Sequence, residues 1–188
     1  MDDESRQFTE SLVAHSRGDR LATEQLFSQL YDRLRRLAGH YLQDEQQRIS
    51  LEPTDIVHEA YLRLVEIDQV DWKDKSHFLA MAATQMRRVL VDQARRRHSQ
   101  KRGGNLRLVS FPPELAGENA HPLDILVVDS ALDRLTKRKE RLGKVAELRL
   151  FAGMRTTEIA HVLEVSPRTV RDDWQFARAW LARELKSS

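Results

Sequence analysis

The stretch from Thr156 to Lys186, TTEIAHVLEVSPRTVRDDWQFARAWLARELK, constrains the fold more than any other part of this chain. Apolar residues recur at helical spacing on both sides of a short break, which predicts a short helix, a tight turn and a longer helix. We expect Thr156 to cap the first helix, and Ser166 with Pro167 to start the second. The pattern is typical of a helix-turn-helix, whose second helix enters a DNA major groove, although an ordinary helical hairpin fits the same residues.

The second predicted helix separates an apolar stripe from a polar face. The stripe that we expect to be buried consists of Val170, Trp174, Ala177 and Leu181. The opposite face carries Arg168, Thr169, Arg171, Asp172, Asp173, Gln175 and Arg178. Two interpretations of Asp172 and Asp173 are open: they accept hydrogen bonds from cytosine amino groups, or they pair with Arg168 and Arg171.

Composition limits the classes of protein to consider. A chain of 188 residues with 32% charged residues and few Gly or Pro is expected to be mostly helical, in one large or two small domains. The net charge is only +2, so any nucleic-acid surface has to be a local patch. The absence of Cys excludes disulfides and cysteine-zinc sites. The N-terminus is polar and acidic, unlike a signal peptide, and no apolar run approaches the roughly 20 residues that span a membrane.

Four helices are predicted before residue 103. The first covers residues 8–16, and a longer one follows at about 21–42. The third, in LEPTDIVHEAYLRLVEI at 51–67, carries two acidic residues one turn apart on its exposed side, Asp55 and Glu59. Like charges at this spacing repel by a few tenths of a kcal/mol, and Arg63 can partly neutralise Glu59. A solvated charged face and a docking surface for a basic partner fit these residues equally well.

A fourth helix is predicted from His77 to about His98, with Ser76 as its cap. The polar side chains that we expect on its exposed side are Gln85, Arg87, Arg88, Asp92, Arg95 and Arg96. The helix finishes in the basic run ARRRHSQKR at 94–102, which exceeds what a helix C-terminus requires and favours a footprint for phosphate. Trp72 lies among charges in the loop that precedes it.

Residues 103–122 lose the helical period and contain two glycines and a Pro-Pro pair, which is typical of a linker. A short extended piece is predicted around Leu108 and Val109. The helical pattern resumes at Leu123, and a turn is predicted at Gly153.

This order of elements resembles a sigma-70 family initiation factor of the extracytoplasmic-function (ECF) type, from about Phe8 to Leu185. The segment LEPTDIVHEAYLRLVE resembles sigma region 2.2, which grips the clamp of RNA polymerase. The segment HFLAMAATQMRRVLVDQARRR resembles regions 2.3 and 2.4, which open and read the −10 element. The segment LFAGMRTTEIAHVLEVSPRTVRDDWQFARAWLARELK resembles region 4, which reads the −35 element.

The resemblance implies an all-α fold of two helical domains joined by a flexible linker. It assigns residues 1–102 to a region 2-like domain, 103–122 to the linker and 123–188 to a region 4-like helix-turn-helix domain. It implies a non-enzymatic initiation factor in the bacterial cytoplasm, associated with the nucleoid when bound to polymerase. The implied partners are the clamp and flap of core RNA polymerase, promoter DNA and an anti-sigma factor, with no cofactor, no metal and no membrane insertion.

The resemblance also implies three sets of site residues. The polymerase-binding set is Asp55, His58, Glu59 and Arg63. The set for the −10 element is Trp72, Lys73, Arg87, Arg88, Asp92, Arg95, Arg96 and Arg97. The set for the −35 element is Arg168, Thr169, Arg171, Asp172, Gln175 and Arg178.

The chain departs from the pattern of the family at several positions. Many relatives carry Trp where Met81 stands, and some carry Arg where Asp173 and Phe176 stand. The turn of the helix-turn-helix usually has Gly where Glu164 stands, so we expect Glu164 to adopt a positive φ.

Two other classes of protein are alternatives. A stand-alone helix-turn-helix regulator would bind an operator without polymerase. A metal-dependent hydrolase has no support, because His58-Glu59 lacks the second His of a metalloprotease motif at Leu62 and the seven His are scattered. No Gly-rich phosphate loop or nucleophile motif is present either.

Overall fold

The computed structural model describes residues 20–42, 52–65, 74–100, 108–110 and 123–186. Seven helices and one pair of two-residue strands make up this part of the chain. The helices are α2 (Arg20–Tyr41), α3 (Pro53–Val65), α4 (Lys75–Gln100), α6 (Ile125–Arg138), α7 (Glu140–Ala152), α8 (Thr156–Val162) and α9 (Pro167–Lys186). The expected all-helical fold class is therefore confirmed. The predicted helix at 8–16, Trp72, Lys73 and most of the linker lie outside the described residues.

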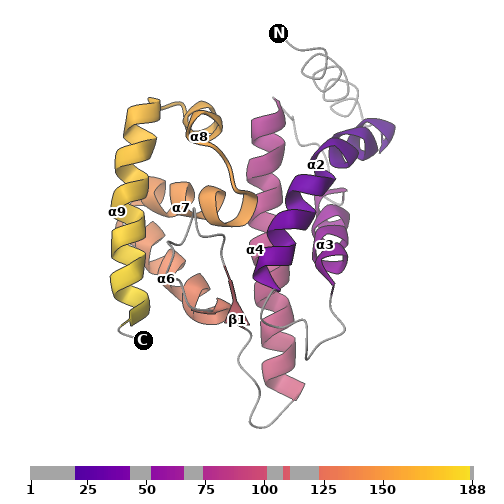
Figure 1. The fold of residues 1–188 in the computed structure, drawn as a ribbon, viewed down its shortest axis with the longest axis horizontal. Coiled ribbons are helices and arrows are strands. Elements are labelled where there is room, and N and C mark those ends of the chain that lie inside the picture. Colours follow the sequence, from indigo (N-terminus) through magenta and orange to yellow (C-terminus); the bar gives the residue numbers. More distant parts are fainter. Residues whose placement is uncertain (1–19, 43–51, 66–73, 101–107, 111–122, 187–188) are drawn as a thin grey trace.

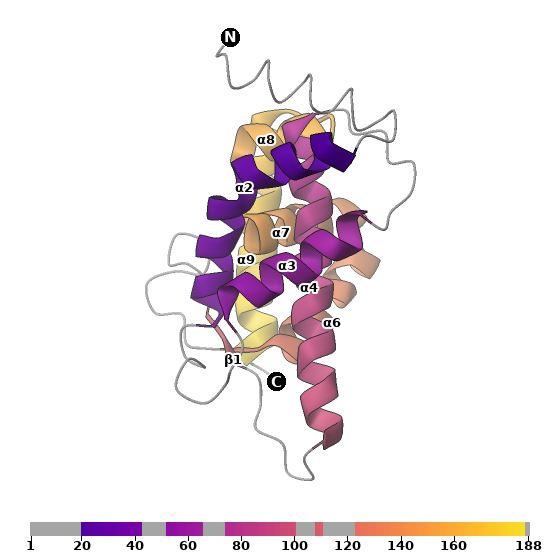
Figure 2. The same cartoon turned by 90° about the vertical axis from the view of Figure 1, so that its right-hand side faces the viewer.

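Helix α4 stands at the centre of the molecule (Figures 1 and 2). Helices α2 and α3 lie on one side of it, and α6, α7, α8 and α9 lie on the other. Its largest contact surfaces are with α7 and α3. A helix covered from two sides needs apolar residues around most of its circumference, unlike a surface helix with a single apolar stripe.

The burial of α4 follows this requirement. Seven apolar residues of this helix are fully buried: Phe78, Leu79, Ala82, Ala83, Met86, Val89 and Leu90. Ala80, Val91 and Ala94 are buried as well. The prediction that Gln85 lies on the exposed side is wrong, because Gln85 is only 3% exposed.

The helices before and after the linker share one hydrophobic core. Tyr41 of α2 and Phe151 of α7 are fully buried, and their ring centroids lie 5.9 Å apart. The Tyr41 hydroxyl donates a hydrogen bond to the carbonyl of Leu150. We call residues 20–100 the N-terminal half and residues 123–186 the C-terminal half; their division into separable domains remains a prediction.

The two strands join the described part of the linker to the residues that follow it. β1 (Leu108–Val109) pairs antiparallel with β2 (Leu123–Asp124), which confirms the extended piece predicted around Leu108. Helix α6 begins two residues later than predicted, because Leu123 and Asp124 are in the strand. Asp124 then caps α6 by accepting a hydrogen bond from the backbone N–H of Leu126 at 3.0 Å.

Gly153 ends α7 in the left-handed region with φ of 57°, as the predicted turn requires. Within the described part of the chain, none of the helices has the length and apolar character needed to cross a membrane.

Candidate nucleic-acid interface

The predicted short helix, turn and longer helix are present as α8 and α9. Ser166 caps α9, since its hydroxyl accepts a hydrogen bond from the backbone N–H of Thr169 at 3.0 Å. Pro167 is the first residue of α9, where its missing N–H costs nothing. Glu164 in the turn has φ of 53°, which confirms the predicted positive φ.

The start of α8 differs from the prediction. Arg155, not Thr156, is the N-cap, and its backbone N–H donates to the Glu158 carboxylate at 2.5 Å. The Thr156 hydroxyl accepts from Arg149 instead. Glu158 replaces a hydroxyl cap because its carboxylate is already held near this helix end by Arg33 of α2, at 2.9 Å.

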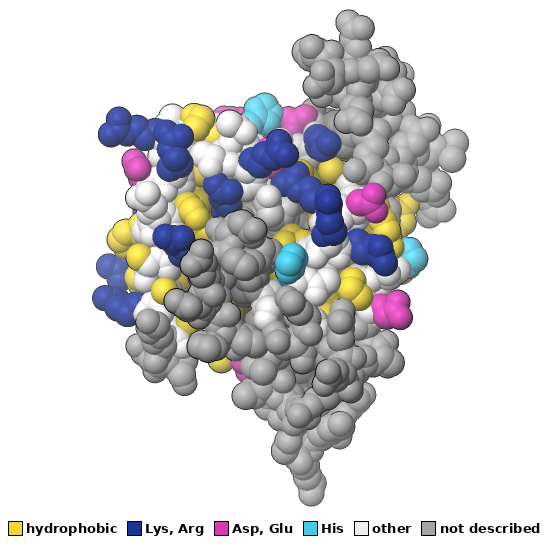
Figure 3. Space-filling view, viewed as in Figure 1, with side chains coloured by type: hydrophobic (Ala, Val, Ile, Leu, Met, Phe, Trp, Pro, Cys, Tyr) yellow, Lys and Arg dark blue, Asp and Glu magenta, His cyan; other side chains and the backbone are white. Residues whose placement is uncertain are grey.

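Helix α9 separates a buried stripe from an exposed polar face, as predicted. Val170, Ala177 and Leu181 are buried, and Trp174 is partly buried beside the Arg149 guanidinium, 6.0 Å from its ring centroid. Five residues of the predicted −35 set are exposed along one side of this helix: Arg168, Arg171, Asp172, Gln175 and Arg178. Thr169 is half-buried. Figure 3 shows Lys and Arg side chains along the edge of the molecule that α9 occupies and over α2.

Asp173 follows neither of the two interpretations made from the sequence. It is buried at 6% exposure and accepts hydrogen bonds from Arg141 at the start of α7, with Nε to Oδ2 at 2.5 Å. Lys139 lies 3.8 Å from the same carboxylate. Asp173 therefore holds α9 against α7, and only Asp172 remains exposed at this position of the helix.

Helix α3 presents Asp55 and His58 to solvent. Asp55 also accepts a hydrogen bond from the backbone N–H of Glu52 at 2.7 Å, so it has a structural role at the helix start. Leu62, one turn beyond His58, is 60% exposed. Sequence reasoning missed Leu62, and the available signal was an apolar residue out of phase with the buried stripe of its helix.

Glu59 lies in a different environment from the one predicted. It is partly buried because it faces α4, where it accepts hydrogen bonds from Gln93 at 2.9 Å and Arg96 at 3.4 Å. Arg63 of its own helix donates to the same carboxylate at 2.8 Å. The predicted neutralisation by Arg63 is confirmed, but the prediction that Glu59 lies on the exposed side is wrong. Arg63 also contacts Asp92 at 2.9 Å, so these side chains form one ionic network between α3 and α4.

The predicted −10 set divides by exposure. Arg88, Arg95 and Arg96 are exposed on α4, whereas the side chain of Arg97 is outside the described residues, as are Trp72 and Lys73. The Arg87 side chain is only 14% exposed. The structure thus separates Arg87 from its neighbours on the same helix.

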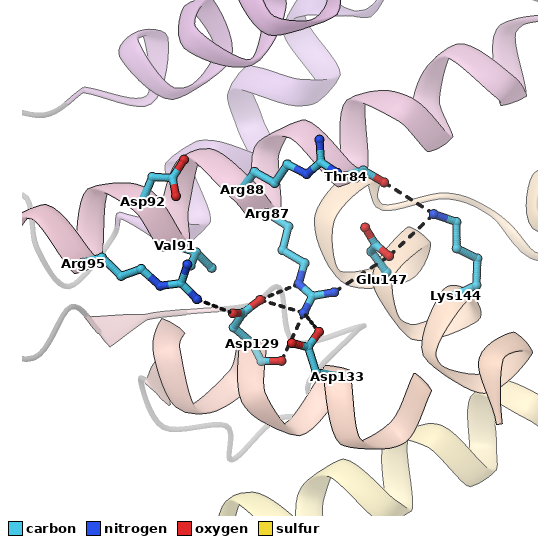
Figure 4. A pocket seen from close by; sticks show the side chains of 10 residues that line it. All are labelled: Thr84, Arg87, Arg88, Val91, Asp92, Arg95, Asp129, Asp133, Lys144 and Glu147. Carbon is cyan, nitrogen blue, oxygen red and sulfur yellow. Dashed lines mark hydrogen bonds and ion pairs between the residues drawn. The ribbon is translucent and has the colours of Figure 1, made fainter. Parts of the chain in front are cut away.

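Arg87 points into a hollow of about 320 Å³ between α4, α6 and α7 (Figure 4). Its guanidinium donates to Asp129 at 2.8 Å and to Asp133 at 2.5 Å, and it lies 4.0 Å from Glu147. Burial lowers the pKa of Arg87, but the hydrogen bond that it donates to Asp133 and the charge of Asp129 outweigh this effect and raise the pKa overall. Arg87 is therefore a cation held by carboxylates.

The other contacts in this hollow also join the two halves. Arg95 lies 3.6 Å from Asp129, and Lys144 of α7 donates to the Thr84 hydroxyl of α4 at 3.4 Å. Sequence reasoning missed Asp129, Asp133 and Glu147, because they lie more than forty residues beyond Arg87 and no spacing rule links them to it. We call Arg87 with these three acidic residues the acidic lock.

Comparison with known proteins identifies a matching sequence family. A sequence-family model described as "ECF sigma factor" matches residues 5–187, which covers both halves and the linker. No curated protein matches the chain.

Proposed function

Because the chain belongs to the ECF sigma factor family, we propose that it binds core RNA polymerase through its N-terminal half and directs it to promoters with matched −10 and −35 elements. As a member of this family the chain is a transcription initiation factor and not an enzyme. Synthesis chemistry belongs to the polymerase, whereas this chain supplies promoter choice and helps to open the duplex.

We assign residues 1–102 to polymerase and −10 binding, 103–122 to the linker and 123–188 to −35 binding. The exposed face of α9 is the observation that carries this proposal. It offers three arginines and a glutamine, side chains that bind phosphates and purine edges, on a helix that follows a tight turn. Asp172 on the same face makes this surface less basic, so polymerase contributes much of the grip on promoter DNA.

The proposed polymerase contact is the exposed side of α3, with Asp55, His58 and Leu62. An acidic residue gives complementarity to a basic partner, and an exposed Leu gives apolar area that a partner can bury. Glu59 and Arg63 support this surface from behind, through their contacts with α4. The addition of Leu62 and the supporting role of Glu59 modify the set derived from the sequence.

Promoter binding by the N-terminal half requires the acidic lock to open. With Arg87 held by the C-terminal half, its Nε and Nη2 donors are engaged by Asp129 and Asp133 and cannot bind a DNA backbone or a flipped base. The packed chain is therefore the resting form, and binding to polymerase separates the halves so that each reaches its own promoter element. An anti-sigma partner stays a prediction from the family.

The direct test is templated transcription. The chain is mixed with bacterial core polymerase and a promoter library, and the transcripts are sequenced. We expect initiation at promoters that share two spaced elements. DNA binding to a symmetric operator without polymerase, with no initiation, would support the stand-alone regulator instead and remove the sigma function.

The polymerase contact is tested by Asp55→Arg combined with Leu62→Arg. Both side chains are exposed, so we expect the melting temperature to stay within about 2 °C while binding to core polymerase weakens at least tenfold. Co-purification and fluorescence titration with core polymerase measure the effect. The matched control is the charge reversal Asp32→Arg on the exposed side of α2. Unchanged binding by the double variant removes the α3 assignment.

A further inference from the structure

Three potential metal ligands converge where the start of α4 meets the end of α8. Asp74 and His77 come from the N-terminal half, and His161 comes from α8, 87 residues beyond Asp74. One ligand atom from each residue lies within 4.8 Å of the other two. In the described part of the chain this is the one group of three or more His, Asp or Glu residues with such spacing.

The Asp74 carboxylate is oriented for this arrangement by the start of α4. Its Oδ1 accepts hydrogen bonds from the backbone N–H groups of Ser76 at 2.7 Å and His77 at 3.2 Å. Asp74, not Ser76 as predicted, therefore caps the helix, and its other oxygen is turned toward the two imidazoles. Carboxylates and imidazoles fixed in this way by neighbouring groups make better metal ligands than freely rotating ones.

Both imidazoles meet the same oxygen. Oδ2 of Asp74 lies 3.2 Å from Nδ1 of His77 and 2.5 Å from Nε2 of His161. The two rings are 5.9 Å apart and inclined at 73°, so their nitrogens approach the carboxylate from different directions. Ligand atoms around a tetrahedral ion with bonds of about 2.0–2.2 Å lie roughly 3.3 Å apart, so small side-chain rotations suffice.

We propose that Asp74, His77 and His161 form a site for a divalent transition-metal ion of the Zn²⁺ type, which bridges the N-terminal and C-terminal halves. Two imidazoles and one carboxylate are a donor set that Zn²⁺ and its first-row neighbours accept, with water as the fourth ligand. His161 is 61% exposed, so the open position faces solvent. This site revises the prediction of no metal, which the scattered His in the sequence had favoured.

Because of the position of the site, a bound ion affects how the two halves of the chain are arranged. Because His161 leaves with α8 when the halves separate, only the closed arrangement holds all three ligands. At a free ion concentration of 100 times the dissociation constant, the closed arrangement gains a factor of about 100 over the open one. If the proposed initiation function holds, the ion keeps the chain in its resting form.

The first measurement is a calorimetric titration of the full chain with Zn²⁺. We expect the parent to bind one Zn²⁺ ion per chain. In His161→Ala the affinity should fall by more than the roughly 10–100-fold that is lost when a group that only orients a metal ligand is removed. His77→Ala loses the site as well. His40→Ala is the matched control, because His40 is exposed on α2 and lies outside the group. Binding that survives in both His161→Ala and His77→Ala overturns the site.

The second measurement tests the bridge. The chain has no Cys, so Arg36→Cys on α2 and Ala179→Cys on α9 allow two fluorescent labels to report the distance between the halves. We expect Zn²⁺ to raise the urea concentration at which energy transfer is lost, in the parent and in His40→Ala but not in His161→Ala. Zn²⁺ binding without this shift overturns the bridge.

Folding is checked in every variant by circular dichroism at 222 nm, and His161→Gln replaces His161→Ala if helix content falls. Polymerase and DNA are absent from these measurements. A failed metal site and a failed initiation function therefore give separate results.

Discussion

Glu164 occupies a backbone conformation that L-residues rarely adopt, with φ of 53° in the turn between α8 and α9. It is the one non-glycine residue with positive φ in the described part of the chain. Its side chain is exposed, so packing gives no reason for a glutamate here. The turn holds its shape because the flanking elements are fixed by Ser166 at the start of α9 and by the buried Ile159 of α8.

Glu164→Gly should therefore raise the free energy of unfolding by about 1 kcal/mol, since glycine adopts this φ without the steric cost of a Cβ. We expect the melting temperature to rise by about 2–4 °C in a thermal scan. Ala182→Gly on the exposed side of α9 is the control and should lower stability by about 1 kcal/mol. Equal losses in both variants would show that the turn imposes no strain on Glu164.

The sequence predicts features that depend on a single helix, and it misses features that depend on the packing of two helices. Helices α2, α3, α4 and α9 follow from periodicity, because apolar residues recur in each at helical spacing, and the start of α9 at Pro167 follows from helix-capping chemistry. The errors at Gln85, Glu59 and Asp173 share one cause. Each was placed on an exposed face from its own helix alone, whereas a second helix covers that face in the folded chain.

The candidate site follows the same rule. Residues exposed on one helix, such as Asp55 and Arg171, are found from spacing within that helix. The acidic lock and the group at Asp74 join residues from different helices, far apart in sequence, and no periodicity reports them. Only the packing of α6, α7 and α8 against α4 brings them together.

The contact between α2 and α8 gives an element-scale prediction about pH. Arg33 of α2 donates two hydrogen bonds of 2.9 Å to Glu158 of α8. Burial raises the pKa of Glu158, but these bonds, the Arg155 N–H and the nearby guanidinium charges outweigh it and lower the pKa below its ordinary value.

A carboxyl group whose pKa is lower in the folded chain stabilises the fold above its unfolded pKa, and this contribution disappears as the pH falls through the folded pKa. Glu158→Gln should therefore lower the melting temperature at pH 7, and the difference from the parent should shrink below about pH 4. Thermal scans from pH 3 to pH 7 measure this. A difference independent of pH would mean that Glu158 acts through packing alone.

The whole molecule is a closed arrangement held by both apolar and ionic contacts. The halves bury Tyr41 against Phe151, and the acidic lock covers Arg87 with carboxylates from α6 and α7. Separation of the halves exposes this apolar surface to water, which costs free energy that a partner has to offset. Polymerase binding is the natural source of that free energy for a chain of this family.

Asp129→Asn combined with Asp133→Asn should shift the chain toward the open arrangement, because both changes remove anions that hold Arg87. We expect its affinity for a single-stranded −10 sequence to rise about tenfold, equivalent to about 1.4 kcal/mol, in fluorescence anisotropy. Asp32→Asn with Glu140→Gln makes the same change in net charge at exposed positions and is the control. Equal gains in both double variants would attribute the effect to net charge and not to the lock.

The acidic lock also has a consequence for the ions that accompany DNA binding. A cation that meets DNA lets the condensed counterions of the phosphates return to solution, and the salt dependence of affinity counts those ions. If Arg87 binds DNA as proposed, it leaves Asp129 and Asp133 behind, and these carboxylates take up cations as it departs. Part of the ion release is thereby cancelled within the protein. A salt titration of promoter binding will count fewer phosphate contacts than the chain makes.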